Sequence, residues 1–247
     1  MFHFAAVSRV AWGQENPFKC WLTNQVGTLN VLEACKKAAS HPIVFYASSR
    51  EVYGEPRVVP VKEGHAKNPV SVYGVTKLCA ENACRSYFQG ISDGNRVNHV
   101  IFRFSNVYGS ERDLPERVIP KFMAKAIRGE DILLYGGDQI LDFTFIEDTI
   151  AGIIKAYKGG IEGKLSGEDF HFVTGNGCSV SDLARMIVDL VHSSSRIIHA
   201  SPNGFDVRRF VGDPSKARLM LGYEPMVKLR DGLKMLSERM LPVIAAR

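Results

Sequence analysis

The stretch IVFYASSREVYG, residues 43–54, decides the fold class of this 247-residue chain. Its first half is a run of apolar, β-branched and aromatic residues with the length of a buried strand. Its second half, from Ser48 onward, is polar and leads away from the strand. Apolar residues recur at helical spacing on both sides, over residues 18–39 before the strand and 73–88 after it. The stretch therefore predicts one strand between two helices.

Two further apolar runs extend this pattern. Residues 2–6 form a short run before the first helix, and residues 97–104 form another after the second helix. The order strand, helix, strand, helix, strand predicts right-handed crossovers and a parallel sheet, and so an α/β fold. In such sheets ligands bind beyond the carboxyl ends of the strands, which here are Ala5–Ser8, Ser48–Glu51 and Ser105–Tyr108.

Composition and charge argue against several classes of protein. Hydrophobic residues make up 45% and charged residues 23%, unlike a disordered or collagen-like chain. No apolar run reaches the roughly 18 residues that span a bilayer, and no secretory signal pattern is present, so we expect no membrane partner and a cytoplasmic location. The net charge of +5 is spread without a basic run, so we expect no nucleic-acid binding. Five cysteines without a CxxC pair and seven histidines without ligand spacing predict no metal site.

Residues 73–77, YGVTK, carry the first chemical signal. Tyr73 and Lys77 are separated by about one helical turn, so both side chains project from one helix face. An ammonium near a phenol favours the phenolate and lowers its pKa from about 10, which makes the tyrosine a general base for a hydroxyl group. The same spacing is also compatible with a Tyr–Lys pair that lies on the surface of a helix and has no catalytic role. Ser48 and Ser49, which follow the strand, favour the catalytic interpretation, because a hydroxyl there can share a proton with the phenol.

Several segments, in order and at matching spacing, resemble the extended short-chain dehydrogenase/reductases, the NAD-dependent nucleotide-sugar epimerases and dehydratases. The segments that carry the resemblance are FHFAA at 2–6, NQVGTLNVLEA at 24–34, YASSREVYG at 46–54, YGVTK at 73–77, RFSNVYG at 103–109, DFTFIED at 142–148, DPSKA at 213–217 and LGY at 221–223. The resemblance implies a partial Rossmann domain, a doubly wound parallel sheet, with a smaller carboxyl-terminal substrate-binding lobe. We expect the NAD-binding domain over residues 1–108, with 142–158 returning to it, and the nucleotide-sugar lobe mainly over 109–247.

The resemblance also implies roles for individual residues. Tyr73 is the expected catalytic base, Lys77 holds the nicotinamide ribose and lowers the pKa of Tyr73, and Ser49 hydrogen-bonds the reacting sugar oxygen. Glu51 occupies the position of an additional acid/base group. The residues implied to bind the cofactor NAD are Phe4, Ala5, Ala6, Asn24, Ser48, Tyr73, Lys77 and Phe104. Those implied to bind the nucleotide diphosphate sugar are Ser49, Asn106, Val118, Tyr135 and Arg208, with Arg209 as the alternative to Arg208.

Three kinds of function follow from these residues. The first is epimerisation of a nucleotide diphosphate sugar through a 4-keto sugar, as in UDP-glucose 4-epimerases, in which NAD takes a hydride while Tyr73 takes the hydroxyl proton. The second is 4,6-dehydration or decarboxylation that uses Glu51. Arg50 replaces the acidic residue of thymidine-diphosphate-glucose dehydratases, so epimerisation is preferred. The third is a non-catalytic protein, either a remnant or a subunit that binds a partner through its helices.

We expect the apolar faces of the two predicted helices to pack mainly in the protein core. The resemblance adds a homodimer in which the helices at 16–39 and 73–88 of two copies pair as a four-helix bundle. Asn24, an indifferent helix former within the first pattern, is either a local hydrogen-bonding residue or a polar link in the site.

The chain departs from the family at two places. Family members carry a Gly-x-x-Gly-x-x-Gly turn, which cradles the pyrophosphate, before the segment that matches FHFAA, and no glycine cluster replaces it here. We therefore expect an amino-terminal truncation, or a turn supplied by another chain, and weak NAD binding by this polypeptide alone. The second departure is Leu141, where the family has an arginine that contacts the nucleotide's phosphates. A charge-assisted hydrogen bond worth about 1.5–3 kcal/mol would be lost there.

Overall fold

The first sheet of the protein is parallel throughout. In the computed structural model, which describes residues 1–90, 96–201 and 207–245, the strands lie in the order β1 (Phe2–His3), β2 (Val44–Ser49), β3 (His99–Phe104) and β7 (Glu168–Phe172). Phe45 of β2 pairs with Phe2 of β1 on one side and with Val100 of β3 on the other. The predicted α/β fold with a parallel sheet is therefore confirmed.

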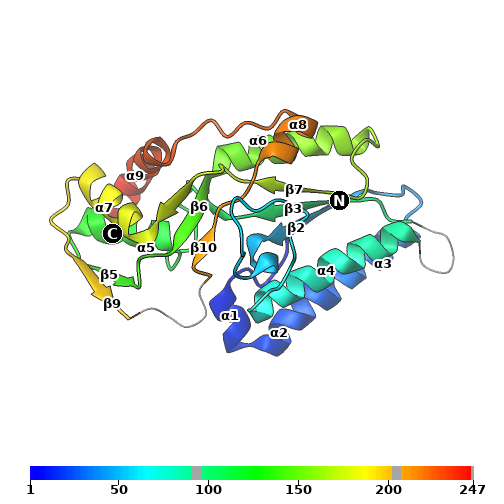
Figure 1. Ribbon diagram of the computed structural model, residues 1–247, viewed down its shortest axis with the longest axis horizontal. Coiled ribbons are helices and arrows are strands. Elements are labelled where there is room, and N and C mark those ends of the chain that lie inside the picture. Colours follow the sequence, from blue (N-terminus) through cyan, green and yellow to red (C-terminus); the bar gives the residue numbers. More distant parts are fainter. Residues whose placement is uncertain (91–95, 202–206, 246–247) are drawn as a thin grey trace.

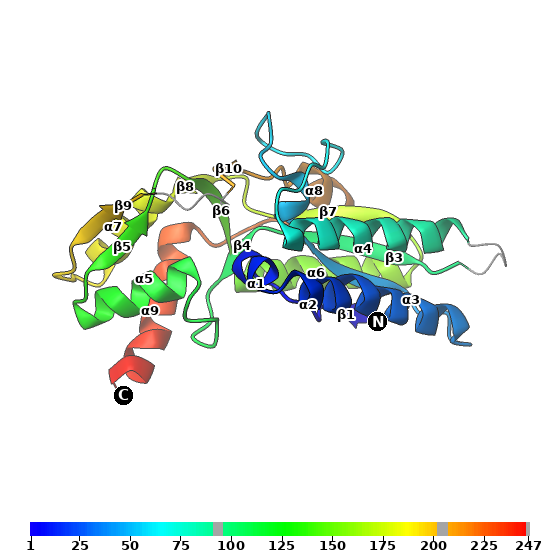
Figure 2. The same cartoon turned by 90° about the horizontal axis from the view of Figure 1, so that it is seen from below.

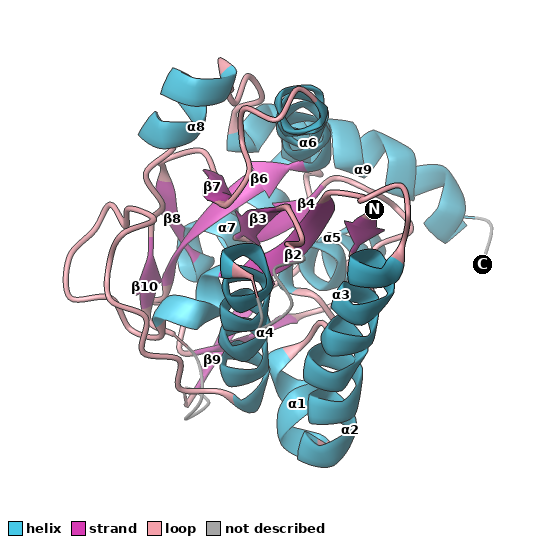
Figure 3. Cartoon of the chain, turned by 90° about the vertical axis from the view of Figure 1, so that its right-hand side faces the viewer, coloured by secondary structure: helices cyan, strands magenta, loops and turns pink. Residues whose placement is uncertain are grey.

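Helices cover both faces of this sheet, which makes it doubly wound (Figures 1 and 3). They are α3 (Gly27–Lys37) and α4 (Val72–Gln89) on one face, and α6 (Ile146–Ile161) and α8 (Ser215–Leu221) on the other. Leu32 of α3 and Ala80 of α4 pack with Tyr46, whereas Ala156 of α6 packs with Phe45. Because successive residues of a strand point to opposite faces, the continuous apolar run of β2 supplies both cores.

The second lobe combines short strands with three helices. Its main sheet has the order β10 (Arg209–Phe210), β6 (Ile140–Phe145) and β4 (Asn106–Tyr108), with β8 (Gly177–Ser179) antiparallel to β6, and a separate pair joins β5 (Ile132–Tyr135) to β9 (Ile197–Ala200). The helices are α5 (Val118–Arg128), α7 (Val180–Leu190) and α9 (Leu229–Ala245). Phe122, Leu134, Leu183 and Leu236 belong to the core that these elements enclose. Figure 2 shows this lobe at one end of an elongated molecule.

The two lobes interleave along the chain. β6 belongs to the second sheet but leads directly into α6, which packs on the first sheet. β7 and α8 also contribute to the core of the first sheet, through Phe170 and Ala217. The first sheet therefore takes in more of the chain than residues 1–108 and 142–158. The reason is the pairing of Phe170 with Phe102, a long-range contact that no local sequence pattern reveals.

The single helix expected over residues 18–39 is divided into three segments. α2 (Pro17–Trp21) begins after Asn16, whose side chain accepts a hydrogen bond from the Lys19 N–H at 3.0 Å. A π-helical segment, η1 (Leu22–Val26), follows and continues into α3. A separate short helix, α1 (Val10–Glu15), precedes α2. Because π-helical turns are rare and cluster at functional sites, η1 draws attention to the residues it carries.

Strand β1 forms one edge of the first sheet. The outer edge of β1 pairs with no strand among the described residues, and Phe2 and Phe4 are 45% and 47% exposed. No helix in the described part of the chain is long and apolar enough to cross a membrane. Within the same ranges, no group of three His, Cys, Asp or Glu side chains is placed to hold a metal ion.

Candidate active site

Polar residues gather at the carboxyl end of β2. Ser49 is the last residue of this strand and caps the 3-10 helix η2 (Arg50–Tyr53), because its Oγ accepts a hydrogen bond from the Glu51 backbone N–H at 3.2 Å. The cap turns the chain at once and keeps Ser49 and Glu51 at the edge of the sheet, where they are 9% and 6% exposed. This is the edge from which β3 continues into β4 of the second lobe.

Helix α4 places Tyr73 and Lys77 beside this strand end. Lys77 Nζ donates a hydrogen bond to the Ala47 carbonyl oxygen at 2.7 Å and lies 5.9 Å from the centroid of the Tyr73 ring. The Ser49 side chain is within hydrogen-bonding reach of the Tyr73 phenol and lowers its pKa. The structure therefore brings together Ser49, Tyr73 and Lys77, which the sequence places 28 residues apart at most.

Gly74 allows α4 to lie this close to η2. A Cβ atom built on Gly74 would lie 2.6 Å from the Glu51 carbonyl oxygen and 3.1 Å from the Pro69 side chain. The Gly74 N–H also donates to the Ser71 Oγ at 3.0 Å, which caps the helix. The glycine of the YGVTK motif thus sets the distance between Tyr73 and the strand end.

The pKa of Tyr73 is shifted in the direction opposite to the expected one. Burial of the phenol raises its pKa to about 12, and the Glu51 carboxylate adds to this rise, whereas Ser49 and Arg117 act against it. Burial also lowers the pKa of Lys77 to about 8, because a buried ammonium loses its hydration. The expectation that Lys77 brings the Tyr73 pKa toward neutrality is wrong in this structure, because desolvation of the phenol outweighs the attraction of nearby cations.

Asn24, on the π-helical segment η1, fastens the loop that follows β1. Its Oδ1 accepts a hydrogen bond from the Val7 N–H at 2.7 Å, and its Nδ2 donates to the Val7 carbonyl oxygen at 3.1 Å. The same Nδ2 donates to Thr76 Oγ1 on α4 at 3.0 Å. Asn24 is 1% exposed, so it positions the loop and has almost no surface of its own for a ligand.

The other residues expected to bind a cofactor lie around this loop. Phe4, Ala5 and Ala6 follow β1 directly, and Phe104 is the last residue of β3. The rings of Phe4 and Phe104 meet edge-on, with 6.2 Å between their centroids. Phe4 and Phe104 thus meet where the chain leaves β1 and β3, the strands on either side of β2, and Phe104 packs on the face of the sheet that α6 covers.

Ser48 belongs to a buried charge network that sequence reasoning missed. Its Oγ donates to Glu81 Oε1 at 2.6 Å. The Arg103 guanidinium, fully buried, donates to both Glu81 oxygens at 2.8 and 2.7 Å and to Asp169 Oδ2 at 2.7 Å. Burial alone would raise the pKa of Glu81, but the hydrogen bonds and charge of Arg103 hold it below its usual value. A charged residue within the apolar strand pattern at 97–104 was the available signal.

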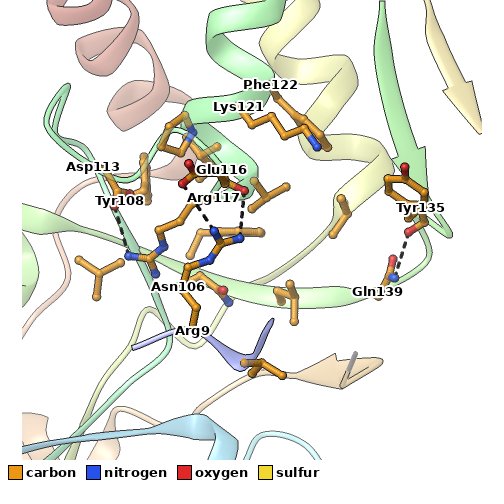
Figure 4. A pocket seen from close by; sticks show the side chains of 18 of the residues that line it. Arg9, Asn106, Tyr108, Asp113, Glu116, Arg117, Lys121, Phe122, Tyr135 and Gln139 are labelled. Atoms are coloured by element: carbon orange, nitrogen blue, oxygen red, sulfur yellow. Dashed lines mark hydrogen bonds and ion pairs between the residues drawn. The ribbon is translucent and has the colours of Figure 1, made fainter. Parts of the chain in front are cut away.

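A cavity of about 360 Å³ opens between the carboxyl edge of the first sheet and helix α5 (Figure 4). Its lining includes four of the residues predicted from the sequence, Glu51, Asn106, Val118 and Tyr135. Asn106 Nδ2 donates to the Asp142 carbonyl oxygen at 3.3 Å, and Tyr135 is 42% exposed at the far wall. Tyr73 is not among the lining residues, but the charges of two of them, Glu51 and Arg117, contribute to the shift of its pKa.

Arg208 and Arg209 are not among the residues that line this cavity, and the substrate contact expected from Arg208 stays a prediction. The Arg208 N–H donates to Glu55 Oε2 at 2.7 Å, and Arg209 pairs with Ile140 where β10 joins β6. The lining instead includes Val207, the preceding residue. The reason is local: the backbone of this segment is held by the loop after η2 and by β6, and both arginines are exposed.

Arginines from three segments line the cavity, and each contacts an acidic neighbour. Sequence reasoning assigned none of them to the site, although Arg50 stands inside the YASSREVYG segment and Arg9 directly follows Ser8. The three ion pairs are Arg9 with Glu116 at 3.5 Å, Arg117 with Asp113 at 3.4 Å, and Arg50 with Glu51 at 3.0 Å. The first two, drawn in Figure 4, tie the cavity to the loop that precedes α5.

Leu141 forms part of the cavity wall and packs into the core of the second lobe. It is 9% exposed. Leu141, which stands where the family has an arginine, therefore lies in the wall of the cavity.

Comparison with known proteins agrees with this architecture. The family described as GDP-mannose 4,6-dehydratase matches residues 1–236. A protein of Methanocaldococcus jannaschii, provisionally named UDP-glucose 4-epimerase, is 32% identical over 240 residues, which are 95% of this chain and 74% of that protein. UDP-glucuronic acid decarboxylase 1 of Xenopus tropicalis is 31% identical over 242 residues, 94% of this chain. The chain spans about half, 54%, of the length of this decarboxylase.

Solved structures share the fold over nearly the whole chain. UDP-glucose 4-epimerase of Thermotoga maritima with UDP-glucose superposes with a TM-score of 0.89 at 28% identity, covering 98% of this chain and 77% of the epimerase. UDP-glucuronic acid 4-epimerase of Bacillus cereus, in complex with UDP-glucuronic acid and NAD, gives a TM-score of 0.88 at 27% identity, covering 98% and 74%. The family match, the relatives and the strand-end site agree with one another. The chain belongs to the extended short-chain dehydrogenase/reductases, in the family of the nucleotide-sugar epimerases and dehydratases.

Proposed function

We propose that this chain epimerises a nucleotide diphosphate sugar through a 4-keto sugar, with NAD as its cofactor. The observation that carries the proposal is the meeting of Ser49, Tyr73 and Lys77 at the carboxyl end of β2, beside the cavity. Relatives named as UDP-glucose epimerases, and a similar structure that holds UDP-glucose, support a nucleotide-sugar substrate.

The described residues have groups that would bind the nicotinamide half of NAD. Lys77 is 3% exposed, and Ala47 is the one hydrogen-bond acceptor of its ammonium group among them. Since an ammonium has three N–H donors, two are free for the hydroxyls of the nicotinamide ribose. Phe4 and Phe104 provide an apolar wall at the same edge of the sheet. The pyrophosphate half has no matching turn, because the 247 residues contain no Gly-x-x-Gly-x-x-Gly sequence.

Each residue has a defined task in the proposed reaction. Tyr73 takes the proton of the sugar hydroxyl, and Ser49 hydrogen-bonds the same oxygen so that the O–H points at the phenol. Lys77, 5.9 Å from the centroid of the Tyr73 ring, would hold the hydroxyls of the nicotinamide ribose beside the phenol. NAD, when bound, supplies the acceptor for the hydride that leaves the sugar carbon. Because burial holds the Tyr73 pKa near 12, the phenol needs further positive charge beside it before it works as a base, and Arg117 already acts in this direction.

Glu51 favours a second candidate reaction, 4,6-dehydration or decarboxylation of the same class of substrate. Its carboxylate lines the cavity and lies close enough to Tyr73 to shift the pKa of the phenol. Both reactions need an acid/base group besides the tyrosine, and a UDP-glucuronic acid decarboxylase is among the relatives. Glu51 is also paired with Arg50 at 3.0 Å, and because this ion pair already engages its carboxylate, the epimerase remains the first choice.

We also propose that two copies of the chain form a homodimer through the α2–η1 face. Large apolar side chains stand exposed there: Phe18 is 74% exposed, Trp21 40%, Leu22 46% and Val26 42%. Contiguous exposed apolar residues on neighbouring helices are typical of protein interfaces. A non-catalytic subunit that binds a partner through the same face is the competing interpretation, and the catalytic test below separates the two.

The test is analysis of products. The chain is incubated with NAD and either UDP-glucose or UDP-glucuronic acid, and the sugars are identified by proton NMR. The proposal expects the 4-epimer of the substrate. A 4-keto-6-deoxy sugar would establish the dehydratase, and a pentose would establish the decarboxylase. A wild-type chain that binds the nucleotide sugar but yields none of these products would be non-catalytic.

A further inference from the structure

We propose that the cavity selects a nucleotide sugar with a carboxylate at C6, a uronic acid, and that Arg50 is the residue that recognises this carboxylate. The inference rests on the proposed function, because it specifies the sugar that the same cavity takes. It concerns binding alone and is compatible with epimerisation and with decarboxylation, but not with 4,6-dehydration, because a sugar with a carboxylate at C6 has no C6 hydroxyl to expel.

The guanidinium of Arg50 lies in the cavity wall with part of its hydrogen-bonding capacity unused. Its side chain is 13% exposed, and its Nη2 lies 3.0 Å from Glu51 Oε1. The guanidinium also lies over the Phe210 ring, 5.8 Å from the centroid. Its Nη1 is buried and has no hydrogen-bond partner among the described residues. An unsatisfied donor on a buried charged group costs free energy, so an acceptor at this place would stabilise the site.

The position of Arg50 indicates which part of the substrate would supply that acceptor. Arg50 directly follows Ser49, whose side chain is within hydrogen-bonding reach of the Tyr73 phenol, so the reacting C4 hydroxyl would lie nearby. In a nucleotide diphosphate sugar the phosphates are attached to C1, across the ring from C4. C6 is attached to C5, the neighbour of C4. An anionic group that reaches Arg50 is therefore at C6, and a carboxylate matches the planar fork of a guanidinium.

Glu51 makes Arg50 necessary for such a substrate. A sugar carboxylate placed beside the Glu51 carboxylate would be repelled, because like charges at short distance disfavour one another. Arg50 holds Glu51 with Nη2 and keeps Nη1 for a second carboxylate, so a single cation can serve both anions. The other two arginines of the cavity are paired with Glu116 and Asp113 on the loop before α5.

The experiment compares two ligands that differ only at C6. Dissociation constants of the 247-residue chain for UDP-glucuronic acid and UDP-glucose are measured by calorimetry, with and without NAD, for the wild type, Arg50→Met and Arg50→Lys. Arg185→Met, which removes an exposed arginine of α7, is the control for loss of one positive charge. We expect the wild type to bind UDP-glucuronic acid about tenfold or more tighter than UDP-glucose, as for one charge-assisted hydrogen bond.

Arg50→Met should remove most of this preference by weakening UDP-glucuronic acid binding alone, and Arg50→Lys should keep part of it. Arg185→Met should leave both constants unchanged. Equal binding of the two ligands by the wild type, or an equal loss for both in Arg50→Met, overturns the inference and leaves the proposed function standing. Failure of the wild type to bind either ligand overturns the proposed function and the inference together. Circular dichroism identifies a misfolded Met variant, in which case Arg50→Lys and Arg50→Gln decide.

Discussion

Helix α4 approaches η2 so closely at Gly74 that a methyl group on this residue would lie 2.6 Å from the carbonyl oxygen of Glu51. The contact is between one backbone and another, so neither a rotamer change nor a flexible side chain can relieve it. This close approach of the two backbones keeps Tyr73, the residue before Gly74, near Glu51.

The first prediction follows from that contact. Gly74→Ala should destabilise the protein by about 1–3 kcal/mol, because helix and strand end must separate to admit the extra methyl group. Gly64→Ala is the matched control, since a Cβ there meets nothing within 4 Å. Urea denaturation of both variants measures the difference. Equal stability of the two variants would show that α4 does not press on η2 in this way.

The Arg103 network gives a second prediction. Glu81→Gln keeps the shape of the side chain but removes one of the two carboxylates that pair with the fully buried Arg103, so the free energy of unfolding should fall by about 3–5 kcal/mol. Glu162→Gln, which breaks the exposed pair with Lys164, should change stability little. Both are measured by denaturant unfolding. If Glu81→Gln is as stable as Glu162→Gln, the network does not stabilise the fold.

Stability should also depend on pH through His99. Burial of the imidazole, with the Arg85 guanidinium nearby, lowers the pKa of His99 from 6.5 to about 4. The unfolded chain therefore takes up the proton first, so this contribution to stability is complete above pH 6.5 and is lost as the pH falls toward 4. Relative to His99→Leu, the wild type should lose about 2 kcal/mol between about pH 7 and pH 5.

The measurement for this prediction is the free energy of unfolding in urea at several pH values. His199→Gln, which alters an exposed histidine of β9, is the control and should follow the wild type. Parallel pH curves for the wild type and His99→Leu would contradict the assignment to His99.

The proposed homodimer is tested at Phe18. Phe18→Glu places a charge on the α2–η1 face and should convert a dimer into a monomer in sedimentation experiments. Leu219→Glu is the matched control, because Leu219 is 87% exposed on α8, on the opposite face of the first sheet (Figure 1). A wild type that sediments as a monomer, or a dimer that withstands Phe18→Glu, would contradict the proposed interface.

The sequence predicts those parts of the protein that local patterns determine. The apolar run in β2 and the helical spacing around it predict the parallel sheet, and YGVTK places Tyr73 and Lys77 on one face of α4. The local pattern predicted a continuous helix and not the π-helical turn at Asn24, whose side chain is bonded to Val7 in the loop after β1.

The electrostatics of the site were harder to predict. The sign of the Tyr73 pKa shift depends on how deeply the folded chain buries the phenol, which no spacing reveals. Arg9 of the cavity is paired with Glu116, an acid from a loop that is distant in sequence, so no local pattern reveals this ion pair. Arg208 was expected to reach the substrate, whereas the cavity lining includes its neighbour Val207 and the Arg208 N–H is bonded to Glu55.

The central claim, that Tyr73 is the proton acceptor of a nucleotide-sugar reaction, is tested most directly by Tyr73→Phe. The control is Tyr157→Phe, which alters a partly exposed tyrosine of α6 that packs against Phe2 and Phe45. Turnover of the UDP-sugar with NAD and its dissociation constant are measured for the wild type and both variants. We predict that Tyr73→Phe loses turnover by at least about 100-fold while its dissociation constant changes less than about threefold, and that Tyr157→Phe matches the wild type. Undiminished turnover in Tyr73→Phe would contradict the account.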